Sequence, residues 1–404
     1  MTSILKKLGP GLIFAGASIG VSHLVQSTRA GADFGLGLIW ALLFIHLFKY
    51  PFFQYGARYA AATGESLLDG YKKLGTGVLT AYYIITLASM FTIQTAVTIV
   101  TAGLASSLFG NFVGIEAWTV IITLVCLTLL VIGKYKLLDN LMKVIIIVLT
   151  ISTIAAVLLA LQNNSQPISF RQVLPDNSIE IAFLIAFMGW MPSPLDLSVF
   201  QSLWVVEKKK TTKNFKTKSA ILDFNIGFIT TIVLGIGFVL LGYLIMFNSG
   251  ESFSPKAEEF SNQLINMYTN SLGNWAYIII AIAAFTTMFS TTLTTLDASP
   301  RAMAKTTQLL FNENLFFDYK FWIALLAIGT ICIFFFFASE MGLLIQIATI
   351  LSFLTAPFYA IINFILISGK HTPKKWHPSI GMKILSYSGI IFLIGFSVWF
   401  LLNL

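Results

Sequence analysis

Eleven apolar stretches dominate this sequence, and each is long enough to cross a lipid bilayer. A membrane-spanning helix needs about 20 consecutive, mostly apolar residues. The stretches cover residues 11–31, 36–62, 78–108, 114–133, 141–162, 178–204, 220–247, 273–296, 319–338, 342–368 and 382–403. Only 10% of the 404 residues are charged, against about 25% in soluble domains. We therefore expect an all-α integral membrane protein with eleven transmembrane helices in one domain, residues 1–404.

Glycine and proline interrupt two of these stretches, at corresponding places in the two halves of the chain. Residues 16–23 read GASIGVSH, and residues 188–194 read MGWMPSP. In lipid, irregular backbone is tolerated only where it lines a cavity or is buried in protein. Paired interruptions of this kind mark the binding site of a transporter, near the bilayer midplane and between half-helices whose ends carry partial charge. We expect the site at these two breaks.

The positions of the breaks predict two repeats of five helices, about 11–162 and 178–368, with an extra helix at 382–403. Because five is an odd number, the second repeat is inverted relative to the first. Lysine and arginine concentrate on one side of the predicted membrane, above all in segment 208–218. Cytoplasmic loops carry this excess, so we expect the N terminus in the cytoplasm and the C terminus outside. The short chain suits a bacterial inner membrane.

Short motifs along the chain carry a family resemblance. They are GPG at 9–11, AGADFG at 30–35, Trp40, MP at 191–192, STTLTT at 290–295 and APF at 356–358. These motifs resemble those of the NRAMP (natural-resistance-associated macrophage protein) family of divalent-metal transporters, within the amino-acid/polyamine/organocation superfamily. The resemblance implies a LeuT-type fold with broken first and sixth helices, and secondary transport by alternating access.

The resemblance also implies that the metal site is remodelled. The family carries Asp-Pro-Gly-Asn in its first broken helix, where this chain has GVSH at 20–23. In the second broken helix the family carries Ala-x-x-Met-Pro-His; Met191 matches, and Ser193 replaces the histidine. Gln94 stands among the positions of the family's proton-passing acids, and Thr349 stands at a family glutamine. The inherited substrate class is a divalent metal cation, without the carboxylate that binds it in the family.

The candidate substrate-binding residues lie at the two breaks and in the stretches 78–108 and 342–368. They are Gly20, Ser22, His23, Gln26, Gln94, Met191, Ser193, Asp196 and Thr349. Asp196 could bind substrate or cap the half-helix that follows it. His23 could contact substrate, carry a proton, or only bond a backbone carbonyl. A metal ion, if the site takes one, would be bound by His23, Met191 and Asp196. Without Asp196, a site of His23, Met191 and backbone carbonyls would suit Cu(I) better than Mn²⁺.

Two alternatives stay open. A small anion such as bicarbonate, or a zwitterion, could bind beside the positive end of a half-helix, with metal transport and proton coupling lost. A sensor that keeps the fold without transport would need a partner, for which segment 208–218 is the candidate surface.

Other function classes find no support in the sequence. The chain has four histidines and no paired catalytic carboxylates at a suitable spacing, and it lacks the phosphate-binding motif of ATP-driven proteins. We expect no enzyme activity and no cofactor. The expected partners are a small ion or solute and the lipid bilayer, not nucleic acid, and the oligomeric state is open.

A few polar groups lie in the apolar stretches away from the breaks. His46 and Lys49 are three residues apart and share a helix face. Lys49 could snorkel or pair with a carboxylate, and we favour a structural pair. Asp223 begins the stretch 220–247, and Asp297 ends the stretch 273–296 near Arg301. We expect these three to form an inner gate or a structural network.

Overall fold

The structure is a computed structural model that describes residues 9–110, 112–132, 135–163, 168–212, 215–247, 253–254, 256–311, 317–337 and 341–402. Residues 213 and 214 of the basic segment 208–218 lie outside these ranges. Helices make up almost all of the described part, which contains no strand. The predicted all-α class is therefore confirmed.

The first half of the chain contains one broken helix and four continuous ones. The broken helix consists of α1 (Pro10–Ser18), the π-helical turn η1 (Ser22–Ser27) and α2 (Thr28–Phe34). The continuous helices are α3 (Ile39–Thr63), α5 (Thr76–Phe109), α6 (Gly114–Ile132) and α7 (Tyr135–Asn163). A short connector, α4 (Leu67–Leu74), joins α3 to α5.

The second half repeats this order. Its broken helix consists of α8 (Ser178–Trp190) and α9 (Leu197–Thr211), and the connector α11 (Ala257–Leu272) occupies the place that α4 has in the first half. The continuous helices are α10 (Thr217–Ile245), α12 (Tyr277–Phe311), α13 (Tyr319–Phe337) and α14 (Met341–Ser368). Two 3-10 turns, η2 (Asn274–Ala276) and η3 (Lys374–Trp376), precede α12 and the last helix, α15 (Ile380–Leu402).

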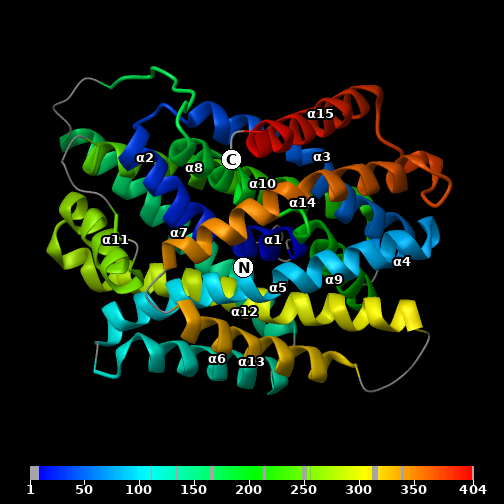
Figure 1. Cartoon of the computed structure of the whole chain (residues 1–404), viewed down its shortest axis with the longest axis horizontal. Helices are drawn as coiled ribbons and strands as arrows, with labels where there is room; N and C mark the ends of the chain where they lie inside the picture. The colour runs from blue at the N-terminus through cyan, green and yellow to red at the C-terminus, as the bar shows by residue number, and fades with distance from the viewer. Residues whose placement is uncertain are drawn as a thin grey trace.

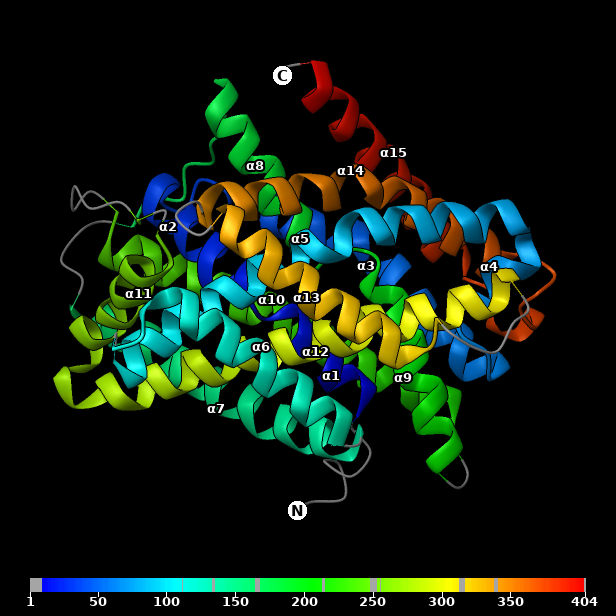
Figure 2. The same cartoon turned by 60° about the horizontal axis from the view of Figure 1, so that its bottom comes forward.

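Equivalent helices of the two halves make equivalent contacts. The first broken helix packs on α7 and α10 through α1. The second broken helix packs on the counterparts of these two helices, on α14 through α8 and on α3 through α9. The third helices of the repeats, α5 and α12, pack on each other. This pattern confirms the predicted 5+5 repeat with breaks in its first and sixth helices. The helix α1 lies near the centre, whereas α15 lies at the edge against α3 and α14 (Figures 1 and 2).

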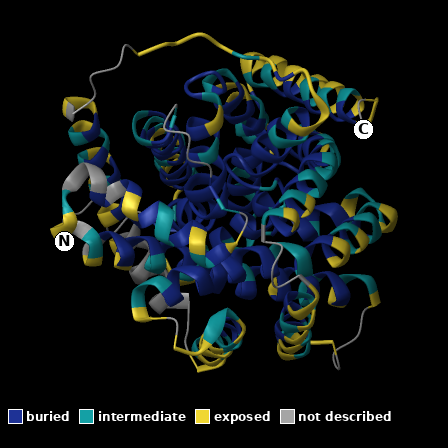
Figure 3. Cartoon of the chain, turned by 60° about the vertical axis from the view of Figure 1, so that its left-hand side comes forward, coloured by how far each residue is buried: buried dark blue, intermediate teal, exposed yellow. Residues whose placement is uncertain are grey.

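Six helices of the described part are long and apolar enough to cross a membrane. They are Thr76–Phe109, Gly114–Ile132, Thr217–Ile245, Tyr319–Phe336, Gly342–Ser368 and Ile380–Leu402. The half-helices α1 and α8 fall short because the breaks leave them 9 and 13 residues long. Buried residues fill the centre of the bundle and exposed ones lie at its periphery (Figure 3). The chain is an integral membrane protein, while the eleven crossings and the orientation of the termini stay predictions.

Two helical segments extend beyond the predicted apolar stretches. The helix α12 continues through Asp297 and Pro300 to Phe311, because charged side chains end a membrane span but not a helix. Arg301 Nε lies 2.7 Å from Asp297 Oδ2, one turn away, and supports the continuation. Between the apolar stretches 220–247 and 273–296 lies the helix α11, whose first turn carries Glu258 and Glu259 at the helix end where negative charge is favourable.

Glycine lets α1 lie directly against α10. A Cβ atom on Gly11 would come 2.0 Å from the carbonyl oxygen of Asp223, and one on Gly227 would come 2.0 Å from the carbonyl oxygen of Gly11. Small residues allow membrane helices to pack backbone against backbone. The position of α1, and therefore of the first break, is set by this contact.

Asp223 of α10 caps the amino end of α1. Its carboxylate accepts hydrogen bonds from the backbone N–H groups of Gly9, at 3.1 Å, and Gly11, at 2.8 Å. The first N–H groups of a helix have no partner within the helix, and a negative charge is favourable there. Asp297 binds Arg301 and the Tyr319 hydroxyl, the latter at 2.7 Å. The contact between Asp223 and α1 was not part of the network expected from sequence.

We expect Asp223→Ala to lower the free energy of unfolding by about 1–2 kcal/mol, because the capped N–H groups lose their acceptor. Thermal unfolding of the purified protein measures this loss. Asp33→Ala is the matched control, since Asp33 is partly exposed and lies 3.9 Å from Arg29, a geometry that contributes little. Equal losses in both variants would contradict the capping role.

Candidate substrate-binding site

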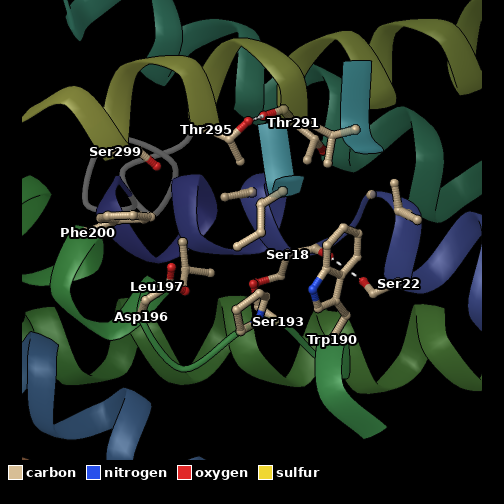
Figure 4. Close-up of a pocket in the computed structure, with 16 residues that line it drawn as sticks. Ser18, Ser22, Trp190, Ser193, Asp196, Leu197, Phe200, Thr291, Thr295 and Ser299 are labelled. Carbon is tan, nitrogen blue, oxygen red and sulfur yellow. Dashed lines mark hydrogen bonds between the residues drawn. The ribbon is translucent and has the colours of Figure 1, made fainter. Parts of the chain in front are cut away.

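A cavity of about 40 Å³ lies between the two broken helices, α5 and α12 (Figure 4). Its lining side chains with a hydroxyl or carboxylate group are Ser18, Ser22, Ser193, Asp196, Thr291, Thr295 and Ser299. At about 10–15 Å³ for each water molecule, this space takes about three waters. It therefore suits a small ion with part of its hydration shell, or a small solute.

Hydroxyl groups stabilise the first break. The Oγ atom of Ser22 lies 2.7 Å from the carbonyl oxygen of Ser18, and Thr291 Oγ1 of α12 donates to the carbonyl of Gly16 at 3.2 Å. Both hydroxyls lie beside carbonyl groups that the end of α1 leaves without a helical partner, and the Ser18 carbonyl also accepts from the backbone N–H of Gly20 at 3.0 Å. Gly20 is needed here because a Cβ atom would lie 2.8 Å from Thr291 Oγ1. The break thus packs tightly against α12.

His23 is fully buried behind the first break and does not line the cavity. Its Nε2 atom lies 3.0 Å from the carbonyl oxygen of Thr231 in α10, and its Nδ1 atom lies 2.7 Å from Ser22 Oγ. A carbonyl oxygen only accepts, so Nε2 carries a proton and donates it to Thr231. Both ring nitrogens are engaged, and His23 reaches the cavity only through the Ser22 hydroxyl.

The second break runs from Met191 to Asp196, between α8 and α9. Asp196 occupies the position before the first residue of α9, but its side chain makes no capping hydrogen bond. It lines the cavity instead and, among the described residues that line it, is the only one with a charged side chain. The amino end of a helix stabilises a negative charge through its free N–H groups. Asp196 is therefore an anionic group available to a ligand.

The close-up shows how the walls face each other. Ser18, Ser193 and Asp196 lie on one side of the cavity, and Thr291 and Thr295 lie on the α12 side (Figure 4). The α12 residues Thr291, Thr295 and Ser299 are spaced by four, so they share one helix face. That spacing was visible in the sequence but was not used to choose candidates.

Three predicted residues are not part of the cavity lining. Gln94 Oε1 accepts a hydrogen bond of 2.6 Å from Thr295 Oγ1, so Gln94 supports a lining residue from behind. Gln26 is buried, and its Oε1 atom has no hydrogen-bond partner within the described ranges. Thr349 Oγ1 donates to Ile345 of its own helix at 2.7 Å, and the Thr349 backbone packs on Gly189.

Met191 is fully buried beside His23 rather than at the cavity surface. A Cβ atom built on Gly235 of α10 would lie 3.7 Å from both Met191 Cε and His23 Cδ2. The structure thus brings Gly20, Ser22, Ser193 and Asp196 to the cavity. It places His23, Gln26, Gln94, Met191 and Thr349 outside the lining. The part of the chain that the structure describes contains no group of three His, Cys, Asp or Glu side chains able to bind a metal.

Comparison with known proteins gives consistent matches over nearly the whole chain. A family model described as natural resistance-associated macrophage protein-like matches residues 11–403. An uncharacterised protein of Pasteurella multocida (strain Pm70) is 33% identical over 402 residues, which cover 97% of this chain and 93% of that protein.

Solved structures share the fold at low identity. A mutant of the Eremococcus coleocola manganese transporter superposes with a TM-score of 0.71 at 15% identity, covering 99% of this chain and 94% of that one. MhsT in complex with L-phenylalanine gives a TM-score of 0.68 at 14% identity, with coverage of 97% and 98%. The predicted LeuT-type transporter fold is confirmed.

Proposed function

Because this chain belongs to the natural resistance-associated macrophage protein-like (NRAMP) family, we propose that it is a secondary transporter that carries a divalent metal cation by alternating access. The observation that carries the proposal is the cavity between the two broken helices with Asp196 in its wall. Transporters of this architecture bind substrate where half-helices meet near the midplane. A carboxylate there supplies the negative charge that a cation needs when it loses part of its hydration shell.

The chemistry of the lining favours a hard cation. The hydroxyl and carboxylate side chains of the described lining offer a metal ion oxygen atoms as ligands. Trp190 also lines the cavity, but its indole N–H donates a hydrogen bond to Ser352. Mg²⁺ is commonly bound through one or two carboxylates and keeps several water molecules, and Mn²⁺ also prefers oxygen ligands. A soft ion such as Cu(I) would need the thioether of Met191, which lies outside the lining. The proposed substrate is therefore a partly hydrated Mg²⁺ or Mn²⁺ ion.

A second candidate substrate is a small zwitterion or other non-metal solute. The observation that favours it is the buried Lys49, which interacts electrostatically with Asp196. Their charges compensate each other, so a solute without net charge would leave the membrane interior neutral. A divalent cation would add two positive charges there, which is costly in lipid.

Isothermal titration distinguishes the two substrates. We expect Mn²⁺ and Mg²⁺ to give saturable binding heats with the purified protein, as Mn²⁺ does with a family protein that keeps the Asp-Pro-Gly-Asn motif. The same protein titrated with bicarbonate and with neutral amino acids should give none. Heats from a non-metal solute, with the family protein positive and no metal response here, would reject the metal and support the second candidate.

A further inference from the structure

Lys49 of α3 lies inside the second break, fully buried, with its ammonium group surrounded by backbone carbonyls. Its Nζ atom donates to the carbonyl oxygens of Met188 at 2.9 Å, Gly189 at 2.7 Å, Met191 at 3.1 Å and Ser193 at 3.2 Å. The first two belong to the last turn of α8, whose carbonyls have no partner further along the helix. The other two belong to the irregular segment that follows.

The four hydrogen-bond acceptors around Nζ favour the charged form of the side chain. Carbonyl oxygens only accept hydrogen bonds, and an ammonium group has three donors and no lone pair. A neutral amine would direct its lone pair toward one of the four oxygens. The carboxyl end of α8 and the carboxylate of Asp196 add further attraction for a positive charge at this point.

Four carbonyl oxygens that converge on one point also form a cation site. Channels and transporters use rings of backbone carbonyls, or the unwound backbone of broken helices, to replace the hydration shell of a monovalent ion. The Nζ–oxygen distances of 2.7–3.2 Å exceed the contacts of about 2.3–2.6 Å typical of Ca²⁺ and about 2.0–2.1 Å of Mg²⁺. The cage therefore has the size for an ammonium group or a large monovalent ion such as K⁺.

We propose that Lys49 is a tethered cation, which permanently fills a carbonyl cage that would otherwise bind a monovalent cation from solution. The cage is formed by the carbonyls of Met188, Gly189, Met191 and Ser193 and stabilises the shape of the second break. Given the transport function proposed above, the transport cycle then needs no dissociable monovalent ion at this position. A residue of the neighbouring helix α3 thus keeps cations from solution out of the carbonyl cage.

The test is cation rescue of Lys49→Ala, read by thermal unfolding without divalent metal or solute. In choline chloride, Lys49→Ala should melt well below the wild-type protein. Ammonium or potassium chloride should raise its melting temperature by about 5 °C or more, saturably, because a ligand that binds only the folded state stabilises it. The wild-type protein should show no such rise. Lys49→Met is the matched control, since an uncharged side chain of similar length occupies the same space and leaves no room for an ion.

Three results would overturn the proposal. One is an equal melting temperature of Lys49→Ala in choline, ammonium and potassium salts. Another is failure to recover folded Lys49→Ala in any of these salts, because an occupied cage should restore the break. The third is a saturable potassium or ammonium response of the wild-type protein equal to that of Lys49→Ala. The assay contains no transported substrate, so a negative result does not bear on the proposed transport function. Conversely, a result that contradicts the transport function does not bear on the carbonyl cage.

Discussion

Asp196→Asn is expected to abolish saturable binding of Mn²⁺ and Mg²⁺, with a loss of affinity of at least about 100-fold. Asp196 supplies the one charged side chain in the part of the cavity lining that the structure describes. Changes that merely reorient metal ligands cost about 10–100-fold in affinity, and this substitution removes the charge itself. The asparagine keeps the size of the side chain, so the fold should persist. Titration calorimetry and uptake into proteoliposomes measure the loss.

Asp33→Asn serves as the control for that experiment. Asp33 lies near the end of α2 beside Arg29 and does not line the cavity. The Asp33→Asn substitution removes one carboxylate from the protein without changing the site, so the affinity for metal should stay within about twofold of wild type. Unchanged binding in Asp196→Asn would exclude the cavity as the cation site. A loss in both variants would point to a general effect of surface charge.

Gly227→Val is expected to prevent α1 from docking on α10. The Cβ atom would overlap the backbone carbonyl of Gly11, 2.0 Å away, and a backbone atom yields only if the whole helix moves. Overpacking costs about 1–3 kcal/mol where side chains can adjust, and more where they cannot. We expect a fall of more than 3 kcal/mol in the free energy of unfolding on that scale, seen as loss of monodisperse protein or of a cooperative thermal transition.

Gly395→Ala in α15 is the matched control. A Cβ atom on Gly395 meets no atom within 4 Å, and alanine favours a helix over glycine by about 1 kcal/mol. This variant should therefore be as stable as wild type or slightly more so. If Gly227→Val were equally well tolerated, the close contact between α1 and α10 could not set the position of the first break.

Local patterns in the sequence predicted the elements of the fold. Hydropathy and helix-breaking residues affect only the backbone within a few residues of their own position. The spans therefore follow from the hydropathy of each stretch, and both breaks follow from the glycine and proline residues at 16–23 and 188–194. The end of α12 was missed because hydropathy reports where a helix leaves lipid, not where its hydrogen bonds stop. The connector α11 was missed because its amphipathic pattern is polar on average.

Partners distant in sequence could not be predicted in the same way. Lys49 lies 139 residues before Met188, and Gly9 lies 214 residues before Asp223. Spacing along one helix did not give the carbonyl partners of Lys49, because it says which residues share a face but not what that face meets. The same holds within the breaks, where Ser22 reaches the cavity and the adjacent His23 does not. Irregular backbone has no period from which side-chain direction can be deduced.

The single hydroxyl proton of Ser22 has three possible acceptors. Ser18 O and His23 Nδ1 both lie at 2.7 Å from Ser22 Oγ, and Pro192 O lies at 3.3 Å. When the imidazole is neutral, Nδ1 accepts the hydrogen bond from the Ser22 hydroxyl, and the Ser18 carbonyl does not receive it. When the imidazole is doubly protonated, Nδ1 donates and the hydroxyl turns to Ser18. One proton gained or lost at His23 thus redirects the Ser22 hydroxyl between Nδ1 and the Ser18 carbonyl, without any heavier atom having to move.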